Sequence, residues 1–382
     1  MRIAYFNANL KVGQDGVTRV IYKMIEGALE RGHEAIAITS TLPAEKERII
    51  PMYAVPSVAL PLQKAYRLAM PGYQSFQKIL AEFKPDILHI NSPCTLGFGA
   101  MKFAKQFNIP IVATYHTHFP TYPRYYNLSS LEELTWRISR KLYNNVDTTF
   151  VPAMPILEEL EQHGIRHLQY IPNGVDTGLF SPERRSEPWR RRLGAADKPI
   201  VLFVSRLVWE KDLRVLADAY KLLRTQRADF QMVIVGDGHA RAEFEAMMPG
   251  AHFLGYQSGL TLAESFASAD IFMFPSTTET FGLVTLEAMA SGLAPVAAKT
   301  GGAVEIIEEG CSGLFAAPLN GEDLANKVRW LLEHPSQRVS IAAQAHRRAQ
   351  MYRWESILAR LFESYSVVKE IHRRRIRLSK AA

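Results

Sequence analysis

The chain has little that would link it to an oxidising compartment or to a bilayer. Its 382 residues include two cysteines, Cys94 and Cys311, which lie far apart and lack metal-ligand spacing, so we expect reduced thiols in a cytoplasmic protein. No apolar run reaches the roughly 18 residues that a membrane span needs, and the strand-like start Met1–Phe6 shows no signal peptide. The chain is also longer than the length at which proteins usually divide into more than one domain. We therefore expect a soluble, cytoplasmic, two-domain protein.

Acidic residues are missing from the end of the chain. Residues 372–382 contain five Lys or Arg and no acid, out of a net charge of +7 for the whole chain. A second basic cluster contains Arg184, Arg185 and residues 190–192. No nucleic-acid-binding motif accompanies either cluster, so we expect no nucleic-acid partner. Two interpretations of the basic tail stay open: attraction to anionic lipid, or a solvated end.

Apolar, strand-like segments alternate with amphipathic helical segments along the chain. This alternation indicates the α/β class, with parallel sheets covered by helices on both faces. We expect a first domain at 1–176, a linker at 177–199, a second domain at 200–353 and a helical tail at 354–382. The predicted strands are 3–7, 35–39, 87–91, 111–115, 148–151, 168–171, 200–204, 231–235, 252–254, 271–274, 294–297 and 313–315. The predicted helices are 17–31, 96–107, 131–143, 154–163, 213–223, 240–247, 260–267 and 322–332.

The segment Pro275–Gly292 (PSTTETFGLVTLEAMASG) carries the most informative pattern. It follows an apolar strand and continues as a helix from about Leu283 to Ala290. Glu279 therefore lies in a loop, and Glu287 points inward from the second helical turn. The turn between them presents backbone N–H groups and the positive end of a helix dipole, which suit an anion. A sugar-nucleotide site is one interpretation, and an amphipathic helix with two solvated glutamates is the other.

Other motifs also follow predicted strands, where open α/β sheets bind ligands. After the first strand, Gly13 and Gly16 precede a helix and could admit a phosphate, although their spacing is not that of the dinucleotide fingerprint. Arg206 and Lys211 follow the first strand of the second half and offer two positive charges to a leaving diphosphate. The chain has no Asp-x-Asp motif, so this interpretation requires no metal. Gly236, Gly238 and His116 also come directly after strands.

The segment 116–126 (HTHFPTYPRYY) is aromatic, proline-stiffened and basic. Aromatic faces suit sugars or lipid head groups, and Arg124 suits a phosphate or a sulfonate. An acceptor site is therefore one interpretation of this segment, and a packed aromatic loop is the other.

Taken in order, these motifs resemble those of the retaining GT-B glycosyltransferases of the group 1, family 4 type, which have two Rossmann-like domains. Glu279-x7-Glu287 resembles their paired-glutamate signature, and VSRLVWEKDL at 204–213 resembles their Gly-Arg-Leu-x-x-Glu-Lys-Gly element. Segment 116–126 is similar to a narrower group of GDP-mannose-dependent α-mannosyltransferases and sulfoquinovosyl-diacylglycerol synthases. Ser205 and Asp212 stand where the family usually has glycine, and Asp15 precedes Gly16 where it often has two glycines. The motifs VGDG at 235–238, PNGVD at 172–176 and ATYHT at 113–117 also match.

The resemblance implies a role for each site. The catalytic residues are His116, Arg206, Lys211 and Glu279, with His116 and Glu279 at the transferred sugar and the two cations at the diphosphate. The donor-binding residues are Gly16, Gly236, Gly238, Phe281, Gly282, Leu283, Val284 and Glu287. The acceptor residues are His118, Tyr122, Arg124 and Tyr126. The resemblance implies no metal and no cofactor beyond the nucleotide-sugar donor, and it implies that the last helix packs back on the first domain.

We therefore expect a retaining hexosyltransferase that moves a hexose, mannose favoured, from a nucleoside diphosphate sugar to a hydroxyl of a lipid or glycolipid. The expected mechanism is front-face, with peripheral contact at the inner face of an anionic membrane. The alternatives are sulfoquinovosyl or glucosyl transfer from a UDP-sugar to diacylglycerol or another acceptor, a nucleotide-sugar epimerase, and a non-catalytic binding module.

Overall fold

The computed structural model describes residues 1–11, 16–59, 67–70, 73–121 and 129–381. It divides the chain into two units, which are described one at a time. The first unit contains Met1–Pro172 and Glu355–Ala382, and the second contains Asn173–Trp354. The predicted linker, 177–199, falls within the second unit and contains a short helix, α7 (Glu187–Arg192).

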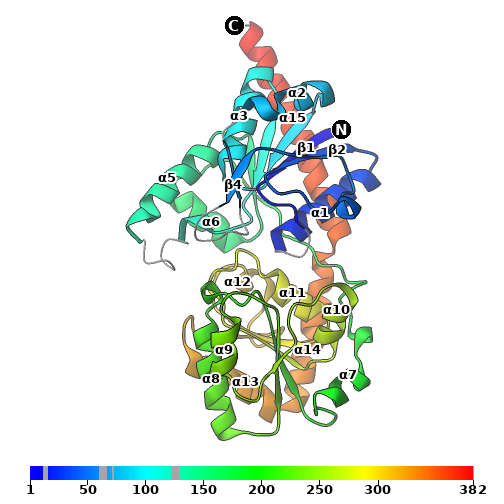
Figure 1. Ribbon diagram of the computed structural model, residues 1–382, viewed down its shortest axis with the longest axis vertical. Helices are drawn as coiled ribbons and strands as arrows, with labels where there is room; N and C mark the ends of the chain where they lie inside the picture. The colour runs from blue at the N-terminus through cyan, green and yellow to red at the C-terminus, as the bar shows by residue number, and fades with distance from the viewer. Residues whose placement is uncertain (12–15, 60–66, 71–72, 122–128, 382) are drawn as a thin grey trace. The chain divides into compact units, whose positions relative to one another are not determined.

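The first unit is built on a parallel sheet with the strand order β3-β2-β1-β6-β7-β8-β9 (Figure 1). Its central strands carry apolar side chains on both faces, and Ile3 to Phe6 are at most 1% exposed. Such strands need helices on both sides. The strands are β1 (Arg2–Asn7), β2 (Glu34–Thr39), β3 (Met52–Ala54), β6 (Ile87–Ile90), β7 (Ile111–Thr114), β8 (Thr148–Val151) and β9 (Leu168–Tyr170). The helices are α1 (Gly16–Glu30), α2 (Tyr73–Phe83), α3 (Thr95–Phe107), α5 (Glu132–Tyr143), α6 (Met154–Gln162) and α15 (Trp354–Ala381).

The second unit repeats this plan with the strand order β12-β11-β10-β13-β14-β15, again parallel throughout. The strands are β10 (Ile200–Val204), β11 (Gln231–Val235), β12 (His252–Phe253), β13 (Ile271–Phe274), β14 (Ala294–Ala298) and β15 (Leu314–Ala316). The remaining helices are α8 (Leu213–Gln226), α9 (Arg241–Met247), α10 (Gly259–Ala267), α11 (Leu283–Ala290), α12 (Ala303–Ile306), α13 (Gly321–Glu333) and α14 (Pro335–Ala349). The predicted α/β class with two Rossmann-like parallel sheets is confirmed.

The predicted strands and helices all occur, with most ends shifted by a residue or less. The prediction missed β3, the antiparallel hairpin of β4 (Ser57–Ala59) and β5 (Arg67–Ala69), and helices α2, α7, α12 and α14. The missed strands have three residues each, too few to show a two-residue period.

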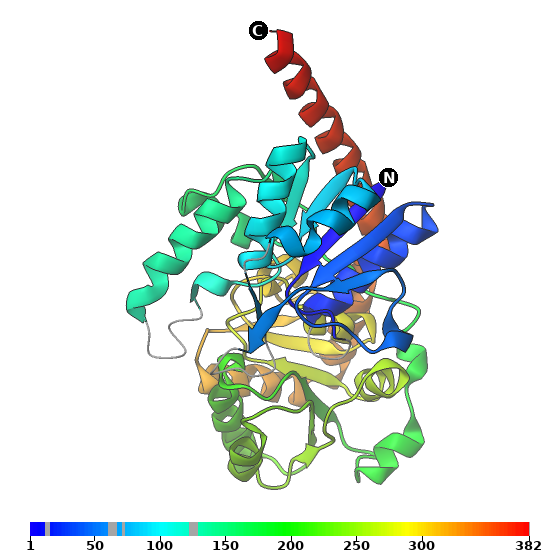
Figure 2. The same cartoon turned by 45° about the horizontal axis from the view of Figure 1, so that its top comes forward.

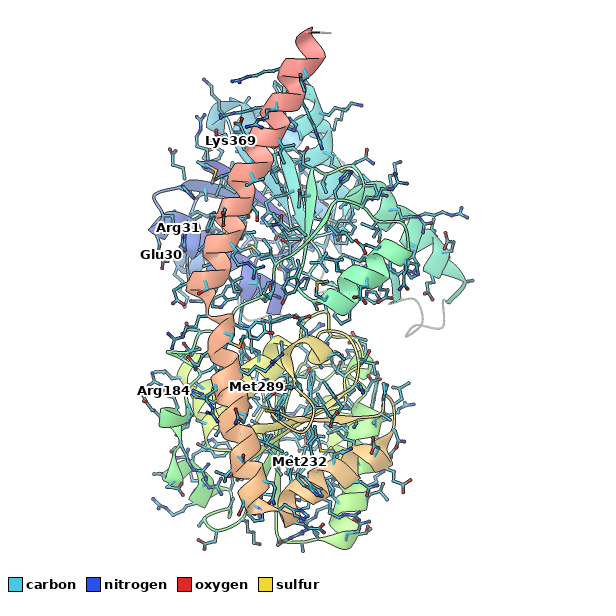
Figure 3. All side chains as sticks on the ribbon, turned by 180° about the vertical axis from the view of Figure 1, so that it is seen from behind. Glu30, Arg31, Arg184, Met232, Met289 and Lys369 are labelled. Atoms are coloured by element: carbon cyan, nitrogen blue, oxygen red, sulfur yellow. The ribbon has the colours of Figure 1, made fainter. Side chains whose placement is uncertain are left out.

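Helix α15 lies along one face of the first sheet (Figure 3). Its buried residues follow a helical spacing: Ile357, Leu358, Leu361, Phe362, Tyr365 and Val368. Toward its end, Lys369 Nζ lies 2.6 Å from Asp86 Oδ1 and His372 Nδ1 lies 3.2 Å from Asp147 Oδ1. The last turns of α15 project beyond the other elements of the first unit (Figures 1 and 2).

Candidate functional site

The order in which the chain adds strands to the second sheet reverses between β10 and β13. These strands are neighbours, with Leu202 opposite Phe272, yet the chain visits β11 and β12 on one side before returning to β13 on the other. The loops that follow β10 and β13 therefore leave the sheet side by side. This is the topological switch point, where open α/β sheets bind their ligands.

Three consecutive residues of the β10 loop hold three consecutive residues of the β13 loop. Thr278 Oγ1 donates to the carbonyl of Glu210 at 3.0 Å. Lys211 Nζ donates to Thr278 Oγ1 at 3.3 Å and to Glu279 Oε1 at 2.5 Å. Asp212 Oδ2 accepts from both the backbone N–H and the hydroxyl of Thr277, each at 2.8 Å. The two motifs, which are more than 60 residues apart in the sequence, form one rigid corner of the second unit.

Lys211 and Glu279 form a largely buried ion pair, with side chains that are 15% and 17% exposed. An ammonium has three N–H donors. Within the described part of the chain two of them are engaged, one by Glu279 and one by Thr278. The third is available to a phosphate oxygen, so Lys211 can hold Glu279 and an anion together.

Arg206 lies just beyond β10 and is half-buried. Its loop packs tightly on the glycines that follow β11. A Cβ on Gly236 would lie 1.8 Å from Ser205 O, and one on Gly238 would lie 2.2 Å from Leu207 O. Any side chain there would displace the Arg206 loop. This contact explains why positions 236 and 238 are occupied by glycine. The predicted contact of these glycines with the nucleoside stays a prediction.

The paired glutamates have the predicted placement. Glu279 is in the loop after β13, and α11 begins at Leu283, with Gly282 before it at φ 91°, a left-handed conformation that favours glycine. Phe281 is buried, Leu283 and Val284 are half-buried, and Glu287 is only 6% exposed. The alternative of two solvated glutamates on an amphipathic helix is therefore wrong.

Gly301 and Gly302 are a part of this corner that the sequence analysis missed. A Cβ on Gly301 would lie 2.2 Å from Glu279 O, and one on Gly302 would lie 2.0 Å from the Cα of Phe281. The N–H of Gly302 donates to Glu279 O at 3.1 Å. The adjacent glycines after β14 were the available signal, since they too follow a strand.

In the first unit, His116 follows β7 and is 8% exposed. Its Nε2 lies 2.9 Å from Oδ1 of Asn91, the residue after β6, so Nε2 donates. Burial lowers the pKa of His116 to about 3, which keeps the imidazole neutral at physiological pH. A neutral His116 with Nε2 protonated leaves Nδ1 as a hydrogen-bond acceptor.

A second buried histidine lies near His116. His89 on β6 is fully buried, with Nε2 2.7 Å from Thr114 Oγ1 and Nδ1 2.5 Å from the hydroxyl of Tyr365 on α15. Burial, and the neighbouring His116 to a smaller extent, hold the pKa of His89 well below its usual range. The sequence analysis missed this residue, which anchors α15 to the first sheet.

The remaining predictions for the first unit are only partly described. Gly16 begins α1, but its loop at 12–15 lies outside the described residues. His118 is held by Tyr115, whose hydroxyl lies 3.0 Å from Nδ1, and by Glu159, whose Oε1 lies 3.2 Å from Nε2. The predicted acceptor residues Tyr122, Arg124 and Tyr126 lie outside the described residues.

The second basic cluster, at 184–192, is partly structural. Arg190 is 4% exposed, and its guanidinium donates to Asp270 Oδ2 at 3.0 Å, to Ser268 O at 2.7 Å and to Lys198 O at 2.8 Å. Arg185 also lies 3.5 Å from Asp270. Such a buried, multiply bonded arginine ties α7 to the second unit and cannot reach a membrane.

Among the described residues, no group of three or more His, Cys, Asp or Glu is arranged to hold a metal ion. No helix in the same part of the chain combines the length and the hydropathy needed to cross a membrane.

Two family models match the chain: glycosyltransferase family 4 at residues 14–179 and glycosyl transferases group 1 at residues 185–348. The chain is 32% identical over 381 residues to a GDP-mannose-dependent alpha-mannosyltransferase of Corynebacterium glutamicum, covering 98% of this chain and 91% of the relative. It is 38% identical over 298 residues to a sulfoquinovosyl transferase of Arabidopsis thaliana, covering 75% of this chain and 58% of the relative. An alpha-monoglucosyldiacylglycerol synthase of Streptococcus pneumoniae is 26% identical over 313 residues, or 78% of this chain and 71% of the relative.

The fold also matches solved structures. The crystal structure of Anabaena HepE in complex with UDP aligns with a TM-score of 0.79 at 23% identity, covering 96% of this chain and all of that one. The motifs, the two parallel sheets and these matches agree, and the chain therefore belongs to the group 1 glycosyltransferases and has their GT-B fold.

Proposed function

We propose that the protein is a retaining hexosyltransferase that moves a hexose from a nucleoside diphosphate sugar to a hydroxyl of a lipid or glycolipid. The observation that carries this proposal is the Lys211–Glu279 pair at the switch point of the second sheet, with Arg206 on the same loop as Lys211. It combines a carboxylate suited to sugar hydroxyls with positive charge suited to a diphosphate.

In the proposed reaction, the bond between the anomeric carbon and the diphosphate oxygen breaks, and its electron pair stays on that oxygen. Arg206 and Lys211 stabilise the negative charge that develops there. The acceptor oxygen bonds to the anomeric carbon on the same face, and its proton passes to the departing diphosphate. Glu279 accepts hydrogen bonds from hydroxyls of the hexose, and Glu287 accepts them from the ribose.

The neutral imidazole of His116 supports the sugar by hydrogen bonding rather than by charge. Because burial keeps its pKa near 3, His116 is a poor proton donor at neutral pH. The alternative mechanism, through a covalent glycosyl-enzyme, needs a carboxylate on the opposite face of the sugar, for which the sequence offers no clear candidate.

For the donor we propose GDP-mannose, because a relative named for that donor aligns with nearly the whole chain. A UDP-sugar is the second candidate, supported by the likeness to the sulfoquinovosyl transferase. Thermal-shift titrations with GDP-mannose, UDP-glucose and UDP-sulfoquinovose would decide between them. The true donor should raise the melting temperature in proportion to its affinity, since only the folded protein binds it.

Transfer and stereochemistry need separate measurements. Release of nucleoside diphosphate that depends on an acceptor would support transfer, and isomerisation of the sugar on the nucleotide would favour the epimerase alternative. NMR of the product should show the anomeric configuration of the donor. An inverted product would contradict the front-face mechanism.

We further propose that the acceptor is reached at an anionic membrane surface through the end of α15. The helix there exposes Val367, Ile371 and Leu378, which are 52%, 46% and 71% exposed and share one face by their spacing. Arg374 lies on the same face by its spacing, and Arg373, Arg375 and Arg377 lie on neighbouring parts of the helix surface. Apolar and basic side chains together suit the interface of an anionic bilayer. The likeness to a synthase of a glucosyl diacylglycerol supports a lipid acceptor.

A further inference from the structure

Asp212 stands at the start of α8 in an uncommon backbone conformation, which aspartate tolerates better than most non-glycine residues. Its φ and ψ are 54° and 40°, in the left-handed region, where non-glycine residues are uncommon. An aspartate before a helix normally has extended backbone and caps the first N–H groups with its carboxylate. Asp212 makes no such cap. Asp212 therefore has neither the extended backbone nor the capping hydrogen bond that an aspartate at this position usually has.

The carboxylate of Asp212 is directed to the other loop of the site. Its Oδ2 accepts the backbone N–H and the hydroxyl of Thr277, each at 2.8 Å. Burial raises the pKa of the Asp212 carboxyl, while the Thr277 bonds and Lys211 act in the opposite direction. A desolvated carboxylate held in place by two donors is a fixed point rather than a mobile surface charge.

The position of Thr277 bears directly on Glu279, two residues further on. Lys211 and Asp212 are adjacent, so the same short loop binds Glu279 through one side chain and Thr277 through the next. Together with the bonds to Thr278, the β10 loop then holds three consecutive residues of the Glu279 loop, and Gly302 holds Glu279 from the β14 side. Without the Asp212 contact, the start of this loop at Thr277 would lose its two bonds to the β10 loop, and only the bonds at Thr278 and Glu279 would remain.

We propose that Asp212 is a positioning residue, which fixes the β13 loop through Thr277 and so sets the geometry in which Glu279 meets Lys211 and the donor sugar. This inference rests on the proposed function of Glu279. It assigns a role to a position where this chain departs from the glycine usual in similar sequences.

Two substitutions at Asp212 distinguish the contribution of its hydrogen bonds from the contributions of its backbone conformation and its charge. Asp212→Asn keeps an oxygen that can accept both Thr277 bonds and suits the left-handed conformation, but it removes the charge. Asp212→Gly suits that conformation best and removes the oxygen. Both variants should therefore fold, with melting temperatures close to that of the unmodified protein. Thr277→Ser and Thr277→Val provide a second pair, which keeps and removes the hydroxyl.

We expect Asp212→Gly to lower kcat by about 10-fold or more, because small displacements of a reacting geometry are costly, with little change in the Kd of the nucleoside diphosphate. Asp212→Asn should retain kcat within about 3-fold of the unmodified protein. The kcat of Thr277→Ser should be higher than that of Thr277→Val. Amide hydrogen exchange at Thr277 should be fast in Asp212→Gly and slow in Asp212→Asn, and this measurement needs no turnover.

Each outcome bears on the proposal. Equal kcat in Asp212→Gly and the unmodified protein would overturn it, as would an Asp212→Asn variant as impaired as Asp212→Gly, since the charge would then matter rather than the bonds. If the unmodified protein transfers no sugar, the proposed function fails, while the exchange of the Thr277 amide still decides whether Asp212 holds the loop.

Discussion

Lys211 Nζ lies 2.5 Å from Glu279 Oε1, and this bond joins two residues that are 68 positions apart in the chain. The motifs predict separate tasks for them, with Lys211 at the diphosphate and Glu279 at the hexose. The structure links the two tasks, because the two side chains form one largely buried ion pair. Each side chain orients the other, so a substitution at either one should affect the contacts with both the diphosphate and the hexose of the donor.

Replacement of Arg206 or Lys211 by alanine should lower turnover far more than it weakens binding of the nucleoside. Both cations lie on the loop after β10, where the charge of the leaving diphosphate is expected to develop. A loss of about 3 kcal/mol in transition-state stabilisation, or roughly 100-fold in kcat, is typical when such a group is removed. Steady-state kinetics with the identified donor, together with calorimetric Kd values for the nucleoside diphosphate, would measure both effects.

Lys221→Ala, an exposed position on α8, provides the control for a lost positive charge. Near-normal turnover in both Arg206→Ala and Lys211→Ala would show that the assignment is wrong. A double-mutant cycle with Glu279→Gln tests the pair itself. Because the two side chains are in contact, their effects on kcat/KM should be non-additive by about 0.5–3 kcal/mol.

The sequence predicted the two parallel sheets well because fully buried strands such as Ile271–Phe274 are short apolar runs bounded by turn residues. It also placed Glu279 in a loop and Glu287 in a helix, since Gly282 marks the start of that helix. Local pattern determines these features, so a single sequence is enough to predict them.

The contacts between distant segments could not be predicted in the same way. The bonds of Asp212 to Thr277 and the close approach of Gly301 to Glu279 depend on which strands become neighbours. The burial of Arg190 beside Asp270 depends on how α7 packs, which a count of charges along the sequence does not show. Periodicity contains no information about such pairings.

Activity should not require a divalent metal. The chain lacks Asp-x-Asp, and Arg206 and Lys211 supply the positive charge that a metal would otherwise bring to the diphosphate. Full turnover in excess EDTA is the expected result, measured after removal of adventitious ions. Loss of activity in EDTA that Mg²⁺ or Mn²⁺ restores would show that the roles of the two cations are misassigned.

Acid should destabilise the first unit through its two buried histidines. The pKa of His116 falls from 6.5 in the unfolded chain to about 3 when folded, so only the unfolded state takes up a proton between these values. The stabilising contribution is therefore complete above pH 6.5 and is lost as the pH falls toward 3. His116 should therefore lower the unfolding free energy by up to about 1.4 kcal/mol per pH unit in this window, and the lowered pKa of buried His89 acts in the same direction.

Chemical denaturation between pH 7 and 4.5 would measure this dependence. His116→Gln removes one titrating group. The unfolding free energy of this variant should fall less steeply with decreasing pH, by the slope that corresponds to about one proton. An unchanged slope would mean that His116 also titrates normally in the folded protein. His239→Gln makes the same substitution at an exposed position and provides the matched control.

Binding to anionic vesicles should depend on the end of α15 and on salt. Arg374 and Arg375 pair with Glu370 and Asp147, so the cleanest substitutions are at Arg373 and Arg377, which lie one helical turn apart. Each basic residue near an anionic surface contributes about 1 kcal/mol, so reversing both charges should weaken binding by at least about 10-fold. Binding by the unmodified protein should also drop steeply from low to physiological salt, where the screening length is about 8 Å.

Flotation with anionic and neutral vesicles would test this expectation. Arg191→Glu/Arg192→Glu makes the same change in net charge at exposed positions of the second unit and should leave binding nearly unchanged. If this control weakens binding as much as Arg373→Glu/Arg377→Glu, overall charge rather than the end of α15 drives the attraction. Equal binding to both kinds of vesicle, or none at low salt, would rule out electrostatic docking and favour a soluble acceptor.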